Sequence, residues 1–263
     1  MNYASRLVRL HDLQMRATAA QYDLWSGDGR VRSTKALADL FFGVTRTLQP
    51  DTFVEAGAKT AEVSLRARGL CPAARVVAFE ANPYNHQLYS EQFQHEKKSV
   101  EYVHSALTDV PGEITFNIVS RRNGADVKRN TGANSILERS DDGVEYERVT
   151  VPATTLDAFL NDPGRTVLWV DVEGASQQVL AGAERVLTQA DAILIELEDK
   201  ASWKGQWTSN DAMVYLYERG LTPVARDFEY RSQHNVLFLS DRALNNADIG
   251  LNLEYYYSSL VSR

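Results

Sequence analysis

The stretch Thr52-Phe-Val-Glu-Ala-Gly-Ala-Lys-Thr-Ala61 decides the fold. In it a short apolar strand runs into a turn at Gly57 and then into a helix-compatible segment that reaches Arg68. A second apolar strand follows at Arg75–Glu80, and Asn82-Pro83 is a typical helix start after it. Strand, turn, helix and strand in this order form the repeating unit of a parallel sheet.

The same alternation continues along the chain. Five further strands are expected, at Val100–His104, Thr166–Val172, Ala192–Glu198, Leu221–Phe228 and His234–Leu239. The last two lie close together with no helix between them, which indicates an antiparallel edge pair. The fold class is therefore α/β, with a seven-stranded, doubly wound, Rossmann-like sheet that is mostly parallel.

Three regions are expected around this pattern. Residues 1–50 read as an N-terminal helical extension, interrupted by a loop at Ser26–Ser33, and serve as a lid or a dimer element. Residues 51–240 form the main α/β domain, and residues 241–263 form an aromatic tail. Two polar segments, Asn117–Arg148 and Ala201–Asn210, break the alternation, and the first reads as a hairpin. Homodimer formation through the N-terminal helices or the tail is a further prediction.

Composition narrows the class of protein. The chain has 263 residues and a single cysteine, so an intrachain disulfide or a multi-cysteine metal site is excluded. Its net charge of −7, from 35 acids against 28 bases, argues against a nucleic-acid partner. No signal-peptide pattern or membrane-length apolar run occurs, so we expect a cytoplasmic protein without a membrane partner.

The first strand-to-helix turn indicates the ligand. Lys59 and Ala61 occupy the places of the second and third glycines of a dinucleotide fingerprint, and a lysine Cβ would crowd a pyrophosphate. Glu80 lies 23 residues after Gly57, where a carboxylate accepts hydrogen bonds from ribose hydroxyls. The pattern favours an adenosine ligand without a pyrophosphate. The alternative is a purely structural turn with a solvated acid at the end of the second strand.

Several motifs together resemble the FkbM-type methyltransferases. They are Glu55-Ala-Gly-Ala, Val77-Ala-Phe-Glu-Ala-Asn-Pro83, Ser105-Ala-Leu, Thr154-Thr-Leu-Asp157, Val170-Asp-Val-Glu-Gly-Ala175 and Glu184. The resemblance runs from about Asp51 to about Leu239. It implies a seven-stranded enzyme that uses S-adenosylmethionine and methylates hydroxyls of sugars and secondary metabolites.

The resemblance also implies roles for individual residues. The expected cofactor-binding residues are Glu55 and Gly57 at the methionine part, with Ala58 and Lys59 in the same turn, Glu80, Ala81 and Asn82 at the ribose, Ser105 and Ala106 near the adenine, and Asp171 near the reactive methyl. The sequence departs from the family at two places, because Lys59 stands where asparagine is usual and Ala61 where glycine is usual. Lys59 is then expected to pair with the carboxylate of the cofactor.

An acidic cluster is expected at the carboxyl ends of two neighbouring strands. Asp171 and Glu173 are two residues apart, as are Glu196 and Glu198, and residues at this spacing share one face of a strand. Asp171 or Glu173 would act as general base for a hydroxyl, with His234 as a further base candidate. Alternatively, Asp171, Glu196 and Glu198 would hold Mg²⁺. In the structural reading, the Glu173-Gly174 pair only shapes a turn.

Three functions follow from these observations. The first is an S-adenosylmethionine-dependent O-methyltransferase acting on a small-molecule or glycan acceptor. The second is a catalytically inactive binding or scaffold module on the same fold. The third and weakest is nucleic-acid methylation, which the negative charge opposes. Trp203 and Trp207 lie in a polar loop, where they either stack on an acceptor or pack the loop onto the body.

Overall fold

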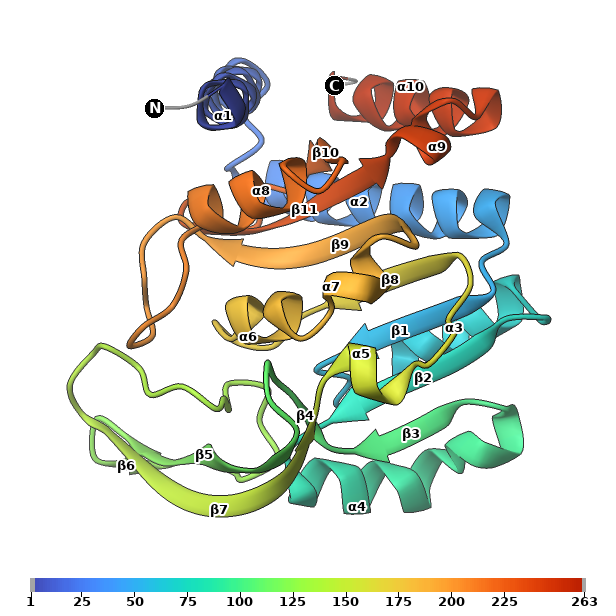
Figure 1. Ribbon diagram of the computed structural model, residues 1–263. Coiled ribbons are helices and arrows are strands. Elements are labelled where there is room, and N and C mark those ends of the chain that lie inside the picture. Colours follow the sequence, from blue (N-terminus) through green and yellow to red (C-terminus); the bar gives the residue numbers. More distant parts are fainter. Residues whose placement is uncertain (1–2, 262–263) are drawn as a thin grey trace.

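The computed structural model describes residues 3–261, and a seven-stranded sheet is its centre (Figure 1). The strands lie in the order β10-β11-β9-β8-β1-β2-β3, and only β11 runs antiparallel to its neighbours. This confirms the predicted sheet and its antiparallel edge. The strands are β1 (Thr52–Ala56), β2 (Arg75–Glu80), β3 (Glu101–His104), β8 (Thr166–Val170), β9 (Ala190–Glu198), β10 (Leu221–Arg226) and β11 (Gln233–Ser240).

Helices cover both faces of the sheet. One core packs side chains of β1, β8, β9 and β11 against α2 (Gly27–Leu48), α3 (Glu62–Leu70) and α10 (Ala247–Val261). The core on the other face includes α5 (Leu156–Phe159), α6 (Ser176–Ala181), α7 (Glu184–Leu187) and α8 (Ser209–Tyr217). Every residue of β1 is buried, as a central parallel strand between two helix layers requires. Outside these two cores, α4 (Pro83–Phe93) lies against β3 and is followed by the short helix η1 (His95–Lys98).

The loop predicted at Ser26–Ser33 is wrong, because α2 already begins at Gly27. The hydroxyl of Ser26 caps this helix by accepting a hydrogen bond from the backbone N–H of Gly29. A Cβ at Gly29 would lie 2.2 Å from the carbonyl oxygen of Asp23, so this glycine permits close packing and does not mark a loop.

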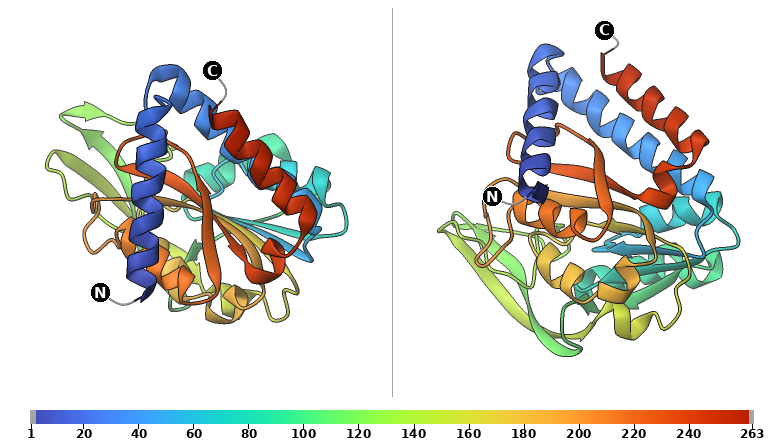
Figure 2. Two further views of the ribbon diagram at one scale, coloured as in Figure 1. Left: turned by 90° about the horizontal axis from the view of Figure 1, so that it is seen from above. Right: turned by 45° about the horizontal axis from the view of Figure 1, so that its top comes forward.

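The N-terminal and C-terminal regions pack on the main domain. In Figure 2, α10 runs along α2, whereas α1 (Tyr3–Gln21) lies over α8. The tail also contains α9 (Asp241–Leu244). Tyr256 is 1% exposed, and its hydroxyl donates to the carbonyl of Arg226, so the aromatic tail docks on the body. Leu10, Leu13 and Tyr255 remain exposed, and homodimer formation through these regions stays a prediction.

The polar excursion forms a second sheet. Its strands β5 (Gly112–Arg122) and β7 (Val144–Thr154) pair antiparallel, which confirms the predicted hairpin and extends it. The short strands β4 (Ala106–Leu107) and β6 (Ala125–Asp126) complete the order β4-β7-β5-β6. Figure 1 shows this sheet beside the ends to which the arrows of β1 and β2 point. The excursion therefore lies at the carboxyl edge of the main sheet, where α/β proteins bind ligands. None of the helices in residues 3–261 has the length and apolar character needed to cross a membrane.

Candidate functional site

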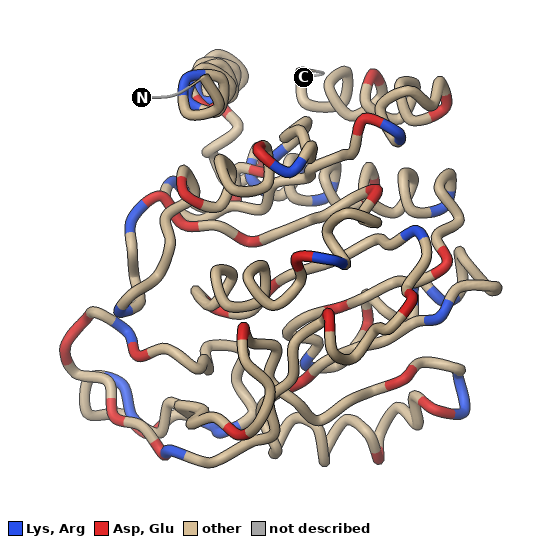
Figure 3. The backbone as a smooth tube through the Cα atoms, in the orientation of Figure 1, with Lys and Arg blue, Asp and Glu red and all other residues tan. Residues whose placement is uncertain are grey.

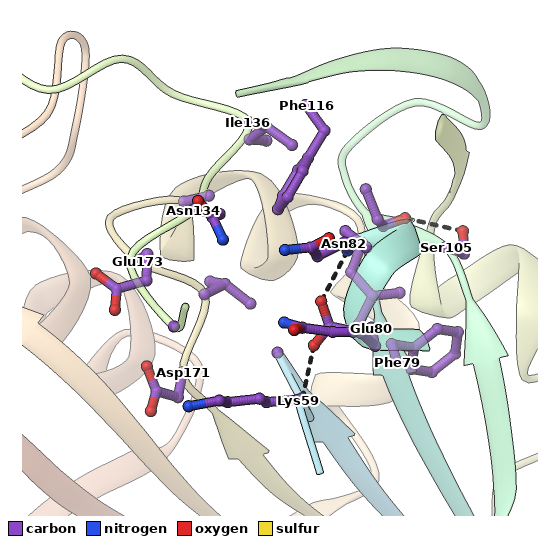
Figure 4. Close-up of a pocket in the computed structure, with 18 of the residues that line it drawn as sticks. Lys59, Phe79, Glu80, Asn82, Ser105, Phe116, Asn134, Ile136, Asp171 and Glu173 are labelled. Atoms are coloured by element: carbon purple, nitrogen blue, oxygen red, sulfur yellow. Dashed lines mark hydrogen bonds between the residues drawn. The ribbon is translucent and has the colours of Figure 1, made fainter. Parts of the chain in front are cut away.

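A pocket opens at the carboxyl edge of the main sheet (Figure 4). The second sheet and its loop form one wall, and the ends of β1, β2 and β8 form the other. The lining includes eight predicted site residues, namely Gly57, Lys59, Glu80, Ala81, Asn82, Ser105, Ala106 and Asp171, together with the predicted base candidate Glu173.

The turn after β1 is held tightly between two strands. The backbone N–H groups of Gly57 and Ala58 both donate to the carbonyl of Phe79, at 3.0 and 2.8 Å. Gly57 has a φ of +81°, and a Cβ there would lie 1.8 Å from the carbonyl oxygen of Asp171. Only glycine fits this position, and its absent side chain lets the turn approach the end of β8.

Two non-glycine residues of this turn also have left-handed backbone conformations. Lys59 has a φ of +45° and Ala61 a φ of +56°. Ala61 and Ala58 are buried in the core and do not line the pocket, whereas Lys59 does. The side chain of Lys59 extends toward Asp171 (Figure 4). Left-handed residues are concentrated at functional sites, where surrounding contacts hold the strained backbone in place.

Glu80 ends β2 and is 5% exposed. Its two carboxylate oxygens accept hydrogen bonds from the backbone N–H groups of Lys59, at 2.6 Å, and Asn82, at 2.7 Å (Figure 4). Burial raises the pKa of Glu80 to about 7, although both hydrogen bonds act to lower it. The carboxylate is thus fixed in direction and faces the pocket, as the ribose-binding prediction requires.

Glu55 lies outside the pocket. It is 3% exposed, and its carboxylate accepts a hydrogen bond of 2.7 Å from the backbone N–H of Ser64, in the first turn of α3. Burial raises the pKa of Glu55 to about 8. This side chain caps a helix, and its predicted place beside the methionine part of the cofactor stays a prediction.

Apolar side chains form a slot at the far end of the pocket. Phe79, Leu107, Phe116 and Ile136 line it together with Ala106. The hydroxyl of Ser105 donates to the backbone carbonyls of Ala106 and Pro152. These apolar side chains share the pocket with the carboxylate of Glu80.

Among the pocket residues that sequence reasoning missed, four come from the loop after β6. They are Thr131, Gly132, Asn134 and Ile136. Asn134 shapes this loop by accepting from the N–H of Val119 and donating to the carbonyl of Thr131. The polar composition of the excursion marked it as a substrate element, but nothing in the sequence marked these four positions.

Two of the four predicted acids reach the pocket. Asp171 and Glu173 line it opposite Ser105 (Figure 4). Burial, followed by the negative charge of Glu229, raises the pKa of Asp171 to about 6. Burial and the charge of Asp171 raise the pKa of Glu173 to about 7. Both groups are thus weaker acids, and their carboxylates stronger bases, than usual.

The other two acids lie outside the pocket lining. Glu196 accepts a hydrogen bond of 2.7 Å from the side chain of Gln233, and burial raises its pKa to about 9. Glu198 is buried and accepts from the indole N–H of Trp203 at 3.2 Å. Within residues 3–261, no three His, Cys, Asp or Glu side chains are grouped so that they could hold a metal ion. The structure thus does not assemble the predicted Mg²⁺ ligands into a site.

His234 is also absent from the pocket lining. It is 2% exposed, and its Nδ1 lies 4.0 Å from a carboxylate oxygen of Asp199. Burial and the nearby positive charge of Arg226 lower its pKa well below the usual value. β11 turns this side chain toward α1, where Asp12 and Arg226 form an ion pair of 3.0 Å. The structure therefore places this base candidate in a buried polar network beneath the N-terminal helix.

Trp203 packs the polar loop onto the body. Its side chain is 1% exposed, and a Cβ on Gly174 would lie 2.3 Å from its ring. The guanidinium of Arg139 lies over the indole ring, 4.7 Å from its centroid. The packing alternative thus describes Trp203. Trp207 packs against Tyr215, with ring centroids 5.0 Å apart.

The fold defines an α/β protein of the Rossmann-like class, with a pocket at the carboxyl edge of its sheet. The family described as "Methyltransferase FkbM domain" matches residues 55–230, and the chain belongs to this family of S-adenosylmethionine-dependent methyltransferases. No curated protein matches the chain significantly.

Solved structures of low identity match parts of the chain. The methyltransferase FkbM from Methylobacillus flagellatus is 13% identical with a TM-score of 0.47, and the match covers 72% of this chain and 44% of that one. Human N-acetylserotonin methyltransferase in complex with S-adenosylmethionine is 12% identical with a TM-score of 0.39, covering 85% and 55%. A precorrin-6y C5,15-methyltransferase from Geobacter metallireducens is 15% identical with a TM-score of 0.37, covering 75% and 86%. The present chain thus spans less than half the length of the first of these proteins.

Proposed function

We propose that this protein transfers the methyl group of S-adenosylmethionine to a hydroxyl of a small-molecule or glycan acceptor. The observation that carries the proposal is the position of Asp171. It lines the same pocket as Glu80 but lies on the opposite side, beside the turn at Gly57. A ribose-binding acid and a basic carboxylate thus face one cavity.

The pocket residues match the parts of the cofactor. Glu80 offers a fixed carboxylate to the ribose, and the slot around Phe79 and Phe116 suits the adenine. The ammonium of Lys59 would bind the carboxylate of the cofactor, while Asp171 and Glu173 favour the positive charge of the sulfonium. The bound cofactor supplies an electrophilic methyl group, and the protein supplies position and charge.

Asp171 is the proposed general base. A hydroxyl must lose its proton as its oxygen attacks the methyl, so O-methylation benefits from a nearby carboxylate. A pKa of about 6 keeps Asp171 ionised at neutral pH and makes it a stronger base than an ordinary aspartate. Glu173, on the same side of the pocket, would hold further hydroxyls of the acceptor by accepting their hydrogen bonds.

The charge distribution supports a small-molecule or glycan acceptor. Basic and acidic residues are interspersed over the described chain in Figure 3, and the pocket adds acids to this mixture. A nucleic-acid substrate needs a surface that neutralises phosphates, so the acidic pocket favours a neutral, hydroxylated acceptor.

Calorimetry and a turnover assay test the proposal. The wild-type protein should bind S-adenosylmethionine and S-adenosylhomocysteine, and it should methylate at least one hydroxylated compound in a panel read by mass spectrometry. Absence of binding at millimolar concentration would refute the proposal. Binding without turnover on any acceptor would instead support the inactive binding module.

A matched pair of variants tests the base. Asp171→Asn should reduce turnover at least about 100-fold, in line with general-base catalysis, while binding of S-adenosylhomocysteine changes less than about threefold. The control is Asp162→Asn, because Asp162 is an exposed aspartate remote from the pocket lining. Full turnover by Asp171→Asn would remove this residue from the mechanism.

A further inference from the structure

Asn85 is a buried amide in the pocket wall. Asn82 caps α4 by accepting from the N–H of Tyr84, and Pro83 begins the helix, which places Asn85 in its first turn. Asn85 is 2% exposed and lines the pocket beside Glu80. Its side-chain oxygen Oδ1 is fully buried and has no hydrogen-bond partner in the protein. Buried polar atoms are almost always paired, so this acceptor requires an explanation.

The orientation of the amide follows from its neighbour. A hydrogen bond from Asn85 to the carboxylate of Glu80 lowers the pKa of that group. A carboxylate only accepts hydrogen bonds, so the donor must be the Nδ2 group. This leaves Oδ1 as a free acceptor next to the ribose-binding acid.

The hydrogen-bonding capacity of Glu80 explains why a second acceptor is needed. An ionised carboxylate offers about four acceptor sites. The N–H groups of Lys59 and Asn82 and the amide of Asn85 occupy three of them. About one site remains, yet the two vicinal hydroxyls of a ribose present two donors.

We propose that Asn85 Oδ1 accepts a hydrogen bond from one ribose hydroxyl of the cofactor while Glu80 accepts from the other. Asn85 is thus a cofactor-binding residue that makes the pocket selective for an intact ribose diol. This inference rests on the proposed function, because it assumes that the adenosyl group occupies this pocket.

The test removes each partner in turn. Calorimetry compares S-adenosylhomocysteine with its 2′-deoxy and 3′-deoxy analogues, on the wild type and on Asn85→Leu, which keeps the side-chain volume. In the wild type, loss of the hydroxyl that Asn85 binds should weaken affinity about five- to tenfold, the range of one hydrogen bond. In Asn85→Leu, the affinity for S-adenosylhomocysteine should fall by a similar factor. The analogue that lacks the hydroxyl bound by Asn85 should then bind this variant within about twofold of S-adenosylhomocysteine.

Two further variants separate binding from structure. Asn85→Ala provides the same comparison with a smaller side chain if Asn85→Leu does not fold, and thermal unfolding reports the integrity of both. Asn161→Ala, at an exposed asparagine outside the pocket lining, should discriminate against the deoxy analogues as the wild type does.

The outcomes distinguish failure of this inference from failure of the proposed function. If Asn85 only orients Glu80, the variants will weaken all three ligands equally and keep the wild-type discrimination, which overturns the inference but not the proposed function. Equal binding of all three ligands by the wild type also overturns it. Failure of the wild type to bind S-adenosylhomocysteine at all would overturn both.

Discussion

Replacement of Glu80 by glutamine should separate cofactor affinity from protein stability. The substitution keeps the shape of the side chain and one acceptor oxygen. It replaces the other oxygen by an NH₂ donor, which then faces the N–H of either Lys59 or Asn82. At pH 8, above the pKa of about 7, the wild-type side chain is mostly ionised, so the comparison is between a carboxylate and a neutral amide.

Two opposing terms act on stability. An unpaired buried N–H costs about 1–3 kcal/mol. Burial raises the pKa of Glu80 from 4.5 to about 7, so the charged group destabilises the folded state increasingly as pH rises from 4.5 to 7. At 1.36 kcal/mol per pKa unit, this cost reaches about 3 kcal/mol at pH 8, and glutamine does not incur it. The two terms nearly cancel, and Glu80→Gln should unfold within about 2 kcal/mol of the wild type.

For the affinity of Glu80→Gln for the cofactor, no second effect offsets the loss of the charged acceptor. A hydrogen bond from a ribose hydroxyl to a charged acceptor contributes about 1.5–3 kcal/mol, so its loss should weaken binding about 10- to 150-fold. Calorimetry with S-adenosylhomocysteine at pH 8 measures this loss, and urea unfolding measures stability. Glu101→Gln is the control, because Glu101 is an exposed acid at the start of β3 that pairs with Arg75. An affinity within twofold of the wild type would refute the assignment of Glu80 to the ribose.

Three more substitutions or conditions test the site. Gly57→Ala should abolish measurable cofactor binding and lower the melting temperature by several degrees, because the new Cβ collides with the carbonyl of Asp171, and normal binding would contradict this geometry. The preference for S-adenosylmethionine over S-adenosylhomocysteine should rise roughly tenfold between pH 5 and pH 8, as Asp171 and Glu173 ionise near pH 6 and 7 and attract the sulfonium, and a flat ratio in calorimetry would count against their role. Trp203→Ala should destabilise the fold by about 3–5 kcal/mol in urea unfolding, because the ring is fully buried, whereas a loss of acceptor affinity alone would indicate stacking on the substrate.

The strands could be predicted because their pattern is local. Val76–Phe79 is an apolar run between the charged residues Arg75 and Glu80, and the structure gives the strand the predicted bounds Arg75–Glu80. Thr166–Val172 was predicted two residues too long, since β8 ends at Val170 and Glu173 and Gly174 then take left-handed conformations. After this strand the chain forms two short helices, α6 and α7, which are separated at Gly182, where a Cβ would lie 2.0 Å from the carbonyl oxygen of Thr108. That contact joins residues far apart in the sequence, so no local pattern reveals it.

The rule that residues two apart share one face of a strand applies to only two of the four predicted acids. Residues two apart share a face only while the strand continues, and this holds for Glu196 and Glu198 within β9. Asp171 and Glu173 lie beyond the end of β8, and the turn brings both to the pocket for a different reason. Conversely, the pocket excludes Glu55, because its carboxylate caps α3. The role of each carboxylate depends on the groups that it contacts, and these contacts follow from the fold and not from the local sequence.

The wall formed by the excursion is the part of the site that could not be predicted. The loop is anchored where Nδ2 of Asn82 donates to the carbonyl of Arg129, at 2.7 Å, and where Arg129 and the hydroxyl of Tyr84 share the carboxylate of Glu147. Asn82 also donates its backbone N–H to Glu80. The start of α4 therefore holds the excursion with its side chains and the carboxylate of Glu80 with its backbone. A change at this helix start alters the wall and the acid together, so the two cannot be optimised independently for different ligands.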